Sequence, residues 1–263
     1  MKIALSGRLW EHPLGVDTTL AQQIQAAAEL GYSGMEIRYP RLPQKQDWEA
    51  TKQLLEQNEV ELVFTAGPGV PETDELKAEF ERVLDTVQFL GGKFLKQIPK
   101  DGADPQAIIW AADESAKRGI KLLSQYHSNS ATDTVAKTEE LFKTINHPNF
   151  GLIFDACHIP FTEVPLISIE EAVTRLRPWI DLVNLQSYKP ATENDGLNHV
   201  TINGKEWSLA LPGDPEGTDM ATAINVLKAQ GYDGWLVAMP AVDPSAQPLV
   251  VGRAYADFLT PFI

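Results

Sequence analysis

The sequence alternates short stretches that favour β-strands with longer amphipathic stretches that favour helices, and it does so eight times. The expected strands cover residues 2–6, 34–38, 61–66, 94–98, 121–125, 151–155, 180–186 and 234–239. The expected helices cover residues 20–30, 48–58, 75–90, 105–118, 134–145, 169–176, 218–230 and 249–259. Such alternation indicates parallel strands joined by right-handed crossovers. Eight units in 263 residues predict one (β/α)8 barrel, a single domain that occupies residues 1–263.

A repeated turn between helix and strand supports this count. Residues 30–37 (LGYSGMEI) recur in form as residues 230–237 (QGYDGWLV), and related turns contain Gly91 and Gly119. Each glycine follows the last expected residue of a helix, where a left-handed backbone is favoured. The main alternative is a doubly wound open sheet, but no Gly-x-Gly-x-x-Gly pattern follows the first strand.

One long insert interrupts the pattern between the seventh strand and its helix. It runs from Ser187 to Pro215, whereas such loops usually contain 2–6 residues. Asn203 and Gly204 stand between two β-forming runs, which predicts a hairpin. Loops in this position surround the active-site end of a barrel. The insert is therefore expected to form a lid or rim wall, with family-specific decoration or an oligomer contact as equal alternatives.

Charge and composition limit the classes of partner. The chain has 22 Lys and Arg against 36 Asp and Glu, a net charge of −14, which argues against nucleic acid and anionic membranes. The sequence contains no apolar run of roughly 20 residues and no signal-peptide pattern at its N-terminus. A single cysteine, Cys157, fits a reducing compartment. We expect a cytoplasmic protein; a homo-oligomer is compatible with the sequence, which does not fix the oligomeric state.

Polar side chains collect where the expected strands end. Side chains alternate between the two faces of a strand. On this basis the polar residues that share the inner face near a strand end, or directly follow it, are Glu36, Arg38, Gln125, His127, Asp155, His158, Asn184 and Gln186. In a barrel these strand ends meet at one rim, so the sequence predicts a small-molecule pocket there.

Each of these residues, considered alone, could instead have a purely structural role. Asp155 could cap the following turn, and His127 or His158 could be a buried histidine without a catalytic role. Glu36 and Arg38 could simply pair with each other. The convergence of several strands on one rim favours the pocket.

Four segments resemble the xylose isomerase-like TIM-barrel superfamily of sugar isomerases and epimerases. They are GYSGMEIR at 31–38, GLIFDACH at 151–158, LPGD at 211–214 and GYDGW at 231–235. The resemblance implies a divalent ion held by Glu, Asp, His and Glu from strands five to eight. It also implies that the two glutamates move the proton next to the sugar carbonyl.

The sequence departs from that pattern at most of the ligand positions. The matching residues are Gln125, Asp155, Asn184 and Met239, with His158 three residues after the aspartate. One carboxylate leaves a dication poorly neutralised, and a thioether is a poor ligand for hard ions. We therefore expect no metal ligands and no cofactor. A weak divalent site, built from the Gln125 oxygen and a nitrogen of His127 or His158, stays open.

Two functions follow from this set of residues. The first is a sugar isomerase or epimerase-family protein that binds a small carbohydrate or hydroxy-keto compound at the barrel mouth. In it, His158 oriented by Asp155 would act as base, with His127 as a further catalytic candidate. The expected substrate-binding residues are Glu36, Arg38, Gln125, Asn184, Gln186, Lys189 and Met239. The second is a non-catalytic carbohydrate-binding protein on the same scaffold, so catalytic activity is left open.

Overall fold

The computed structural model describes residues 1–11, 17–193, 199–240 and 247–263, and its centre is a closed barrel of eight parallel strands. These strands are β1 (Lys2–Ser6), β2 (Gly34–Glu36), β3 (Glu61–Ala66), β4 (Phe94–Gln97), β5 (Lys121–Gln125), β6 (Phe150–Asp155), β7 (Ile180–Leu185) and β11 (Trp235–Ala238). Their order around the barrel is β1-β11-β7-β6-β5-β4-β3-β2. The predicted (β/α)8 barrel is confirmed.

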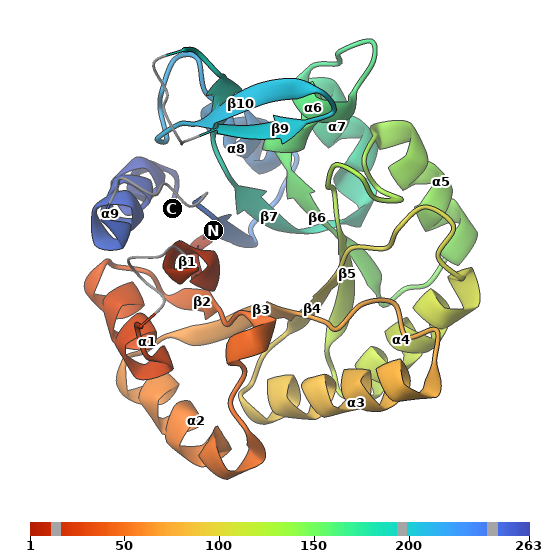
Figure 1. Cartoon of the computed structure of the whole chain (residues 1–263), viewed down its shortest axis with the longest axis vertical. Coiled ribbons are helices and arrows are strands. Elements are labelled where there is room, and N and C mark those ends of the chain that lie inside the picture. The colour runs from red at the N-terminus through yellow and green to blue at the C-terminus, as the bar shows by residue number, and fades with distance from the viewer. Residues whose placement is uncertain (12–16, 194–198, 241–246) are drawn as a thin grey trace.

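Helices surround the strands, as Figure 1 shows. They are α1 (Leu20–Glu29), α2 (Trp48–Gln57), α3 (Asp74–Phe89), α4 (Pro105–Lys117), α5 (Val135–Ile145), α6 (Ile159–Thr162), α7 (Ile169–Leu176), α8 (Met220–Ala229) and α9 (Pro248–Leu259). The expected helix and strand boundaries lie within two residues of the observed ones. The short α6 was not expected, because its four residues are too few to show a helical period.

Local chemistry explains where the helices begin and end. Thr19, Thr73 and Thr134 each precede a helix and accept a hydrogen bond from its first turn through the hydroxyl. The repeated glycines have positive φ angles: 88° at Gly31 and 75° at Gly231. A side chain would strain the backbone there, so the repeated turn is confirmed.

Apolar side chains fill the barrel from its amino-terminal end. The interior layer consists of Ala4, Val63, Phe64, Leu123, Ile153, Leu182, Val237 and Met239, with Phe94 and Trp235 against it. A larger apolar layer lies between the strands and the helices. The fully buried polar layer lies at the carboxyl ends of the strands, and the ion pairs Lys2–Glu61 and Lys121–Asp181 lie near their amino-terminal ends.

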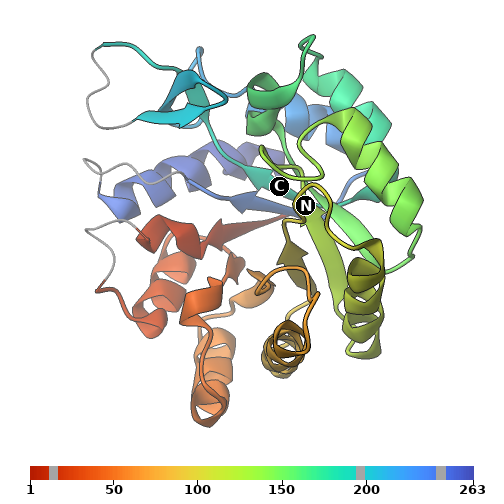
Figure 2. The same cartoon turned by 45° about the vertical axis from the view of Figure 1, so that its right-hand side comes forward.

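The insert after β7 folds into a small antiparallel sheet of β8 (Tyr188–Pro190), β10 (Lys205–Leu209) and β9 (His199–Ile202), in that order. The predicted hairpin is confirmed, with φ of 50° at Asn203 and 74° at Gly204. Strand β8 was not expected, and residues 194–198 of the insert lie outside the described residues. Figure 2 shows this sheet at the edge of the molecule.

Aromatic packing joins the insert to the segment that follows β6. Tyr188 and Trp207 from the insert pack with Cys157 and Phe161. The Asn203 side chain also donates a hydrogen bond of 2.8 Å to the Phe161 carbonyl. The insert is thus fixed to the rim next to Asp155.

Over the described ranges, the structure contains no helix that combines the length and the apolar character needed to cross a membrane.

Gly34 gives a test of the barrel packing. A Cβ atom at this position would lie 2.6 Å from Val63 Cγ2 and 2.7 Å from the Trp235 ring. We expect Gly34→Ala to lower the free energy of unfolding by about 1–3 kcal/mol through overpacking, measured by urea unfolding. Gly67→Ala is the control, because its new Cβ would meet nothing closer than 3.4 Å. Equal stability of the two variants would contradict this packing.

Candidate active site

Polar side chains from six of the barrel strands form a layer above the apolar interior. The members are Ser6, Glu36, Lys96, Gln125, Asp155 and Asn184, and all of them are buried. Neighbouring strands align Ser6 with Glu36 and Asp155 with Asn184. The expected convergence of Glu36, Gln125, Asp155 and Asn184 at the carboxyl ends of the strands is therefore what the structure shows.

Asp155 is fully buried and receives its hydrogen bonds from amides. Gln125 Nε2 donates to its Oδ2 atom over 3.1 Å, and Gln186 Nε2 donates to the same oxygen. The other oxygen, Oδ1, has no hydrogen-bond partner among the described residues. Burial raises the pKa of Asp155 to about 6, although hydrogen bonds from Cys157 and Gln186 oppose the rise. A carboxyl in this state can both accept and release a proton near neutral pH.

The tautomer of His158 is fixed by the backbone. The Ser128 N–H donates to His158 Nδ1 over 3.2 Å, so this nitrogen carries the lone pair and Nε2 carries the proton of the neutral ring. Burial, together with His127 and Arg8, holds the pKa of His158 well below its ordinary value. Nε2 lies 3.8 Å from Asp155 Oδ2 and makes no hydrogen bond within the described part of the chain. His158 thus offers an N–H donor.

His127 has the opposite tautomer. Its Nδ1 lies 2.7 Å from the Ser128 carbonyl, which can only accept, so Nδ1 carries the proton and Nε2 the lone pair. The two imidazole rings are neighbours, with centroids 4.3 Å apart. Burial lowers the pKa of His127, which keeps the ring neutral near pH 7.

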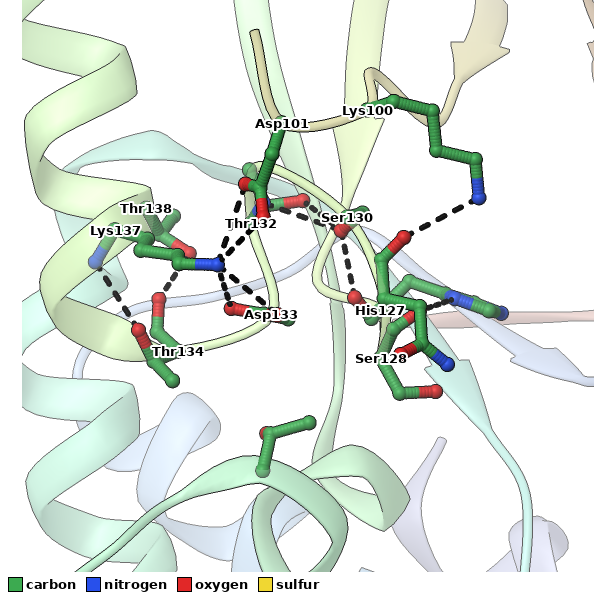
Figure 3. A network of polar contacts seen from close by, with 12 residues as sticks. Lys100, Asp101, His127, Ser128, Ser130, Thr132, Asp133, Thr134, Lys137 and Thr138 are labelled. Carbon is green, nitrogen blue, oxygen red and sulfur yellow. Dashed lines mark hydrogen bonds and ion pairs between the residues drawn. The ribbon is translucent and has the colours of Figure 1, made fainter. Parts of the chain in front are cut away.

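Hydrogen bonds fix the loop after β5, which contains His127 and Ser128 (Figure 3). Thr132 Oγ1 donates to the Gln125 carbonyl, and Ser130 Oγ donates to the His127 carbonyl, both over 2.6 Å. Lys100 Nζ donates to the Asn129 carbonyl over 3.2 Å. These contacts fix the Ser128 N–H that sets the tautomer of His158.

A second cluster of charges faces the barrel from β2 and β4. Glu36 is fully buried, lies 3.0 Å from Arg38 Nη1 and 3.6 Å from Lys96 Nζ, and accepts a hydrogen bond from Ser6. Burial alone would raise the pKa of Glu36, but the charges of Lys96 and Arg38 outweigh it and lower this pKa. The predicted Glu36–Arg38 pairing is present, and Lys96 joins it.

Arg8 belongs to this mouth although the sequence did not reveal it. It lies in the turn Gly7–Trp10 after β1, donates to Gln186 Oε1, and approaches the Tyr188 hydroxyl at 3.5 Å. Lys96 was also missed, although a lone lysine in the buried strand FLKQ is a signal that could have found it. No sequence signal identifies Arg8, because its partners Gln186 and Tyr188 are 178 and 180 residues away in the chain.

Lys189 and Met239, two further expected substrate contacts, each have a partner within the protein. Lys189 lies on β8 and its ammonium is 3.1 Å from Asp214, within the insert, so the structure gives it a partner away from Asp155. Met239 closes the layer with an apolar side chain, and its sulfur lies 3.5 Å from Asn184 Nδ2. Cys157 is buried, and burial next to Asp155 raises the pKa of its thiol well above the ordinary value, so it stays protonated.

Comparisons with known proteins agree with the barrel. The inosose dehydratase of Mesomycoplasma hyopneumoniae (strain J) is 22% identical over 295 residues, which cover 100% of this chain and 96% of that protein. A solved D-psicose 3-epimerase, crystallised in the presence of D-fructose, matches with a TM-score of 0.76 and 16% identity over 100% of this chain and 99% of that one. The IOLI protein with a bound zinc atom matches with a TM-score of 0.75 and 14% identity, covering 100% and 98%.

A family model settles the relationship. The model described as "xylose isomerase-like TIM barrel" matches residues 24–251, which is most of the chain. The same segment contains Asp155 and the other residues of the polar layer except Ser6. The chain belongs to the xylose isomerase-like TIM barrel family.

Proposed function

We propose that this protein binds a small carbohydrate or hydroxy-keto compound at the barrel mouth and moves a proton next to its carbonyl group without a divalent metal ion. The names of its relatives, inosose dehydratase and D-psicose 3-epimerase, support a small sugar-like ligand. One observation supports the metal-free chemistry: the side chains of Asp155 and His158 already form hydrogen bonds with uncharged groups of the protein.

The donor set does not fit the dication that the family resemblance implies. A metal on His158 Nε2 would require the proton on Nδ1, where the Ser128 N–H already points. The amides of Gln125 and Gln186 both donate to Asp155 Oδ2. Cys157, whose sulfur lies within 4.8 Å of ligand atoms from Asp155 and His158, is protonated and so is not a thiolate ligand. One carboxylate without a second anion does not neutralise a dication.

The same contacts suit proton transfer. Asp155 Oδ1 has no hydrogen-bond partner among the described atoms and, with a pKa of about 6, could take the proton from the carbon next to the carbonyl. The His158 Nε2–H would donate to the oxygen of the developing enolate. His127 Nε2 carries a lone pair and so can accept but not supply a proton; Asp155 would return its own proton to the neighbouring carbon, as an isomerisation requires. This arrangement makes Asp155, rather than His158, the base.

A non-catalytic carbohydrate-binding protein is the second candidate. It is favoured by the three amide side chains of Gln125, Asn184 and Gln186, because amides bind sugar hydroxyls well. Asn184 Oδ1 has no partner in the described part of the chain and could accept from a hydroxyl. A ligand that raises the melting temperature but is never converted would favour this function over catalysis.

The metal-free proposal is tested by turnover and metal content together. We expect conversion of at least one member of a panel of ketoses, aldoses and hydroxy-keto acids, with rates unchanged by chelator to within about twofold. Elemental analysis of the purified protein should find substoichiometric Mn, Mg and Zn. A stoichiometric, tightly held ion whose removal abolishes turnover would overturn the proposal.

The role of Asp155 as the base predicts that the activity depends on pH. Because the base must be ionised, kcat/KM should rise with pH and reach a plateau above a pKa of about 6. Asp155→Asn should lower kcat by at least about 100-fold, since an amide cannot take the proton. A flat profile between pH 5 and pH 8 (about one unit below to two above that pKa), or an active Asn variant, would remove Asp155 from the mechanism.

The same carboxyl predicts a pH dependence of stability. Its pKa is raised from 3.8 to about 6, so the native state keeps the proton after the unfolded chain has lost it. Stability relative to Asp155→Asn should therefore fall as pH rises from about 4 to 7, by up to about 3 kcal/mol. Asp257→Asn, an exposed change on α9, should show no such trend in urea unfolding. An equal pH trend in both variants would contradict the burial effect.

A further inference from the structure

Three cations and three carboxylates lie at the barrel mouth, but within the described residues only two of these cations form an ion pair with a carboxylate. Within the described residues, Arg8, Arg38 and Lys96 supply three cations from the loops and strands around β1, β2 and β4. Glu36 is the carboxylate shared by Arg38 and Lys96, and Asp155 lies across the barrel among amide donors. Glu11 pairs with Arg38 on its outer side, over 2.7 Å.

Arg8 is the cation that lacks an anion. Its guanidinium bonds to two neutral acceptors, Gln186 Oε1 and the Tyr188 hydroxyl, and no described carboxylate pairs with it. The residue is half-buried and an arginine cannot lose its proton to relieve the cost of this position. A fixed, incompletely neutralised guanidinium at a site mouth is suited to an incoming oxyanion.

Lys96 extends the same positive region. Only 5% of it is exposed, and its ammonium lies 5.4 Å from the centre of the Phe64 ring and 3.6 Å from Glu36 Oε1. Burial lowers the pKa of Lys96, and the charges of Arg38 and Arg8 lower it further. The three cations are therefore close enough for their charges to act on one another. Lys96 and Arg38 share Glu36, whereas Arg8 has no such carboxylate partner among the described residues.

Because the chain as a whole is acidic, a cation at the barrel mouth with no described carboxylate partner says more about the ligand. With a net charge of −14, the protein surface as a whole repels small anions. A cation at the mouth that has no carboxylate partner among the described residues is the reverse of that average. Neutral sugars need hydrogen-bond donors and acceptors, which Gln125, Asn184 and Gln186 already supply, but they do not need uncompensated charge.

We infer that the ligand of this site is an anionic sugar derivative, whose carboxylate or phosphate group is bound by Arg8 on the side of the mouth that carries Lys96. This inference rests on the proposed carbohydrate function and narrows its substrate class. The planar fork of Arg8 would bind two oxygens of the anion, and the amides across the barrel would bind the hydroxyls.

Calorimetric titration with three probes tests this assignment: D-fructose as the neutral sugar, 2-keto-D-gluconate as the carboxylate and D-fructose 6-phosphate as the phosphate. We expect at least one anionic probe to bind about tenfold or more tightly than D-fructose, with an affinity that falls as salt rises. Whichever anionic probe binds more tightly identifies the anion that the mouth accepts.

Variants then assign the effect to Arg8. Arg8→Gln should reduce the preference for the anionic probe to about threefold or less while D-fructose binding is retained, and Arg8→Lys should keep part of the preference. Arg175→Gln is the matched control, since Arg175 pairs with Glu139 on the helix surface. Melting temperatures without ligand, together with retained D-fructose binding, show that the variants are folded.

The outcomes separate the two proposals. Equal binding of neutral and anionic probes, or an anion preference that survives Arg8→Gln, would overturn the anionic substrate class and leave the carbohydrate function standing. Binding of none of the three probes by the wild-type protein would count against both proposals.

Discussion

Closure of eight parallel strands into one barrel is the constraint from which the rest of this structure follows. It removes every sheet edge and turns half of each strand's side chains toward one axis. Phe64, Leu123, Ile153 and Leu182 fill that axis, and below them the charged side chains are paired, as in Lys121–Asp181. The fully buried ionisable groups Glu36 and Asp155 lie at the carboxyl ends, where they belong to one polar layer.

The electrostatics of that mouth differ from those of a site built around a dication. Asp155 is surrounded by amide donors, and its charge is disfavoured by burial rather than matched by a metal. Glu36, on the other side, is held ionised by Lys96 and Arg38. Two buried carboxylates of one barrel thus have pKa values shifted in opposite directions, which is how one site can supply both a proton acceptor and a fixed charge.

Several residues of the candidate site were accessible to sequence reasoning, and others were not. Glu36, Gln125, Asp155 and Asn184 lie at strand ends with a clear alternation, so their convergence could be predicted. Lys189 was expected near the site because it follows the seventh strand closely, and the insert takes it to Asp214. The proton positions on His127 and His158 depend on the backbone N–H and C=O of Ser128, and no residue pattern encodes the orientation of these two groups.

The sequence by itself determined the number of strand–helix units, the turns that join them, and the hairpin at Asn203 and Gly204. These depend on local periodicity and on backbone preferences of neighbouring residues. Only the tertiary structure decided that Arg8 meets Gln186 and Tyr188, and that Lys96 shares Glu36 with Arg38. Such pairs join strands far apart in the chain, because barrel closure and strand register, rather than sequence separation, set the distances between their side chains.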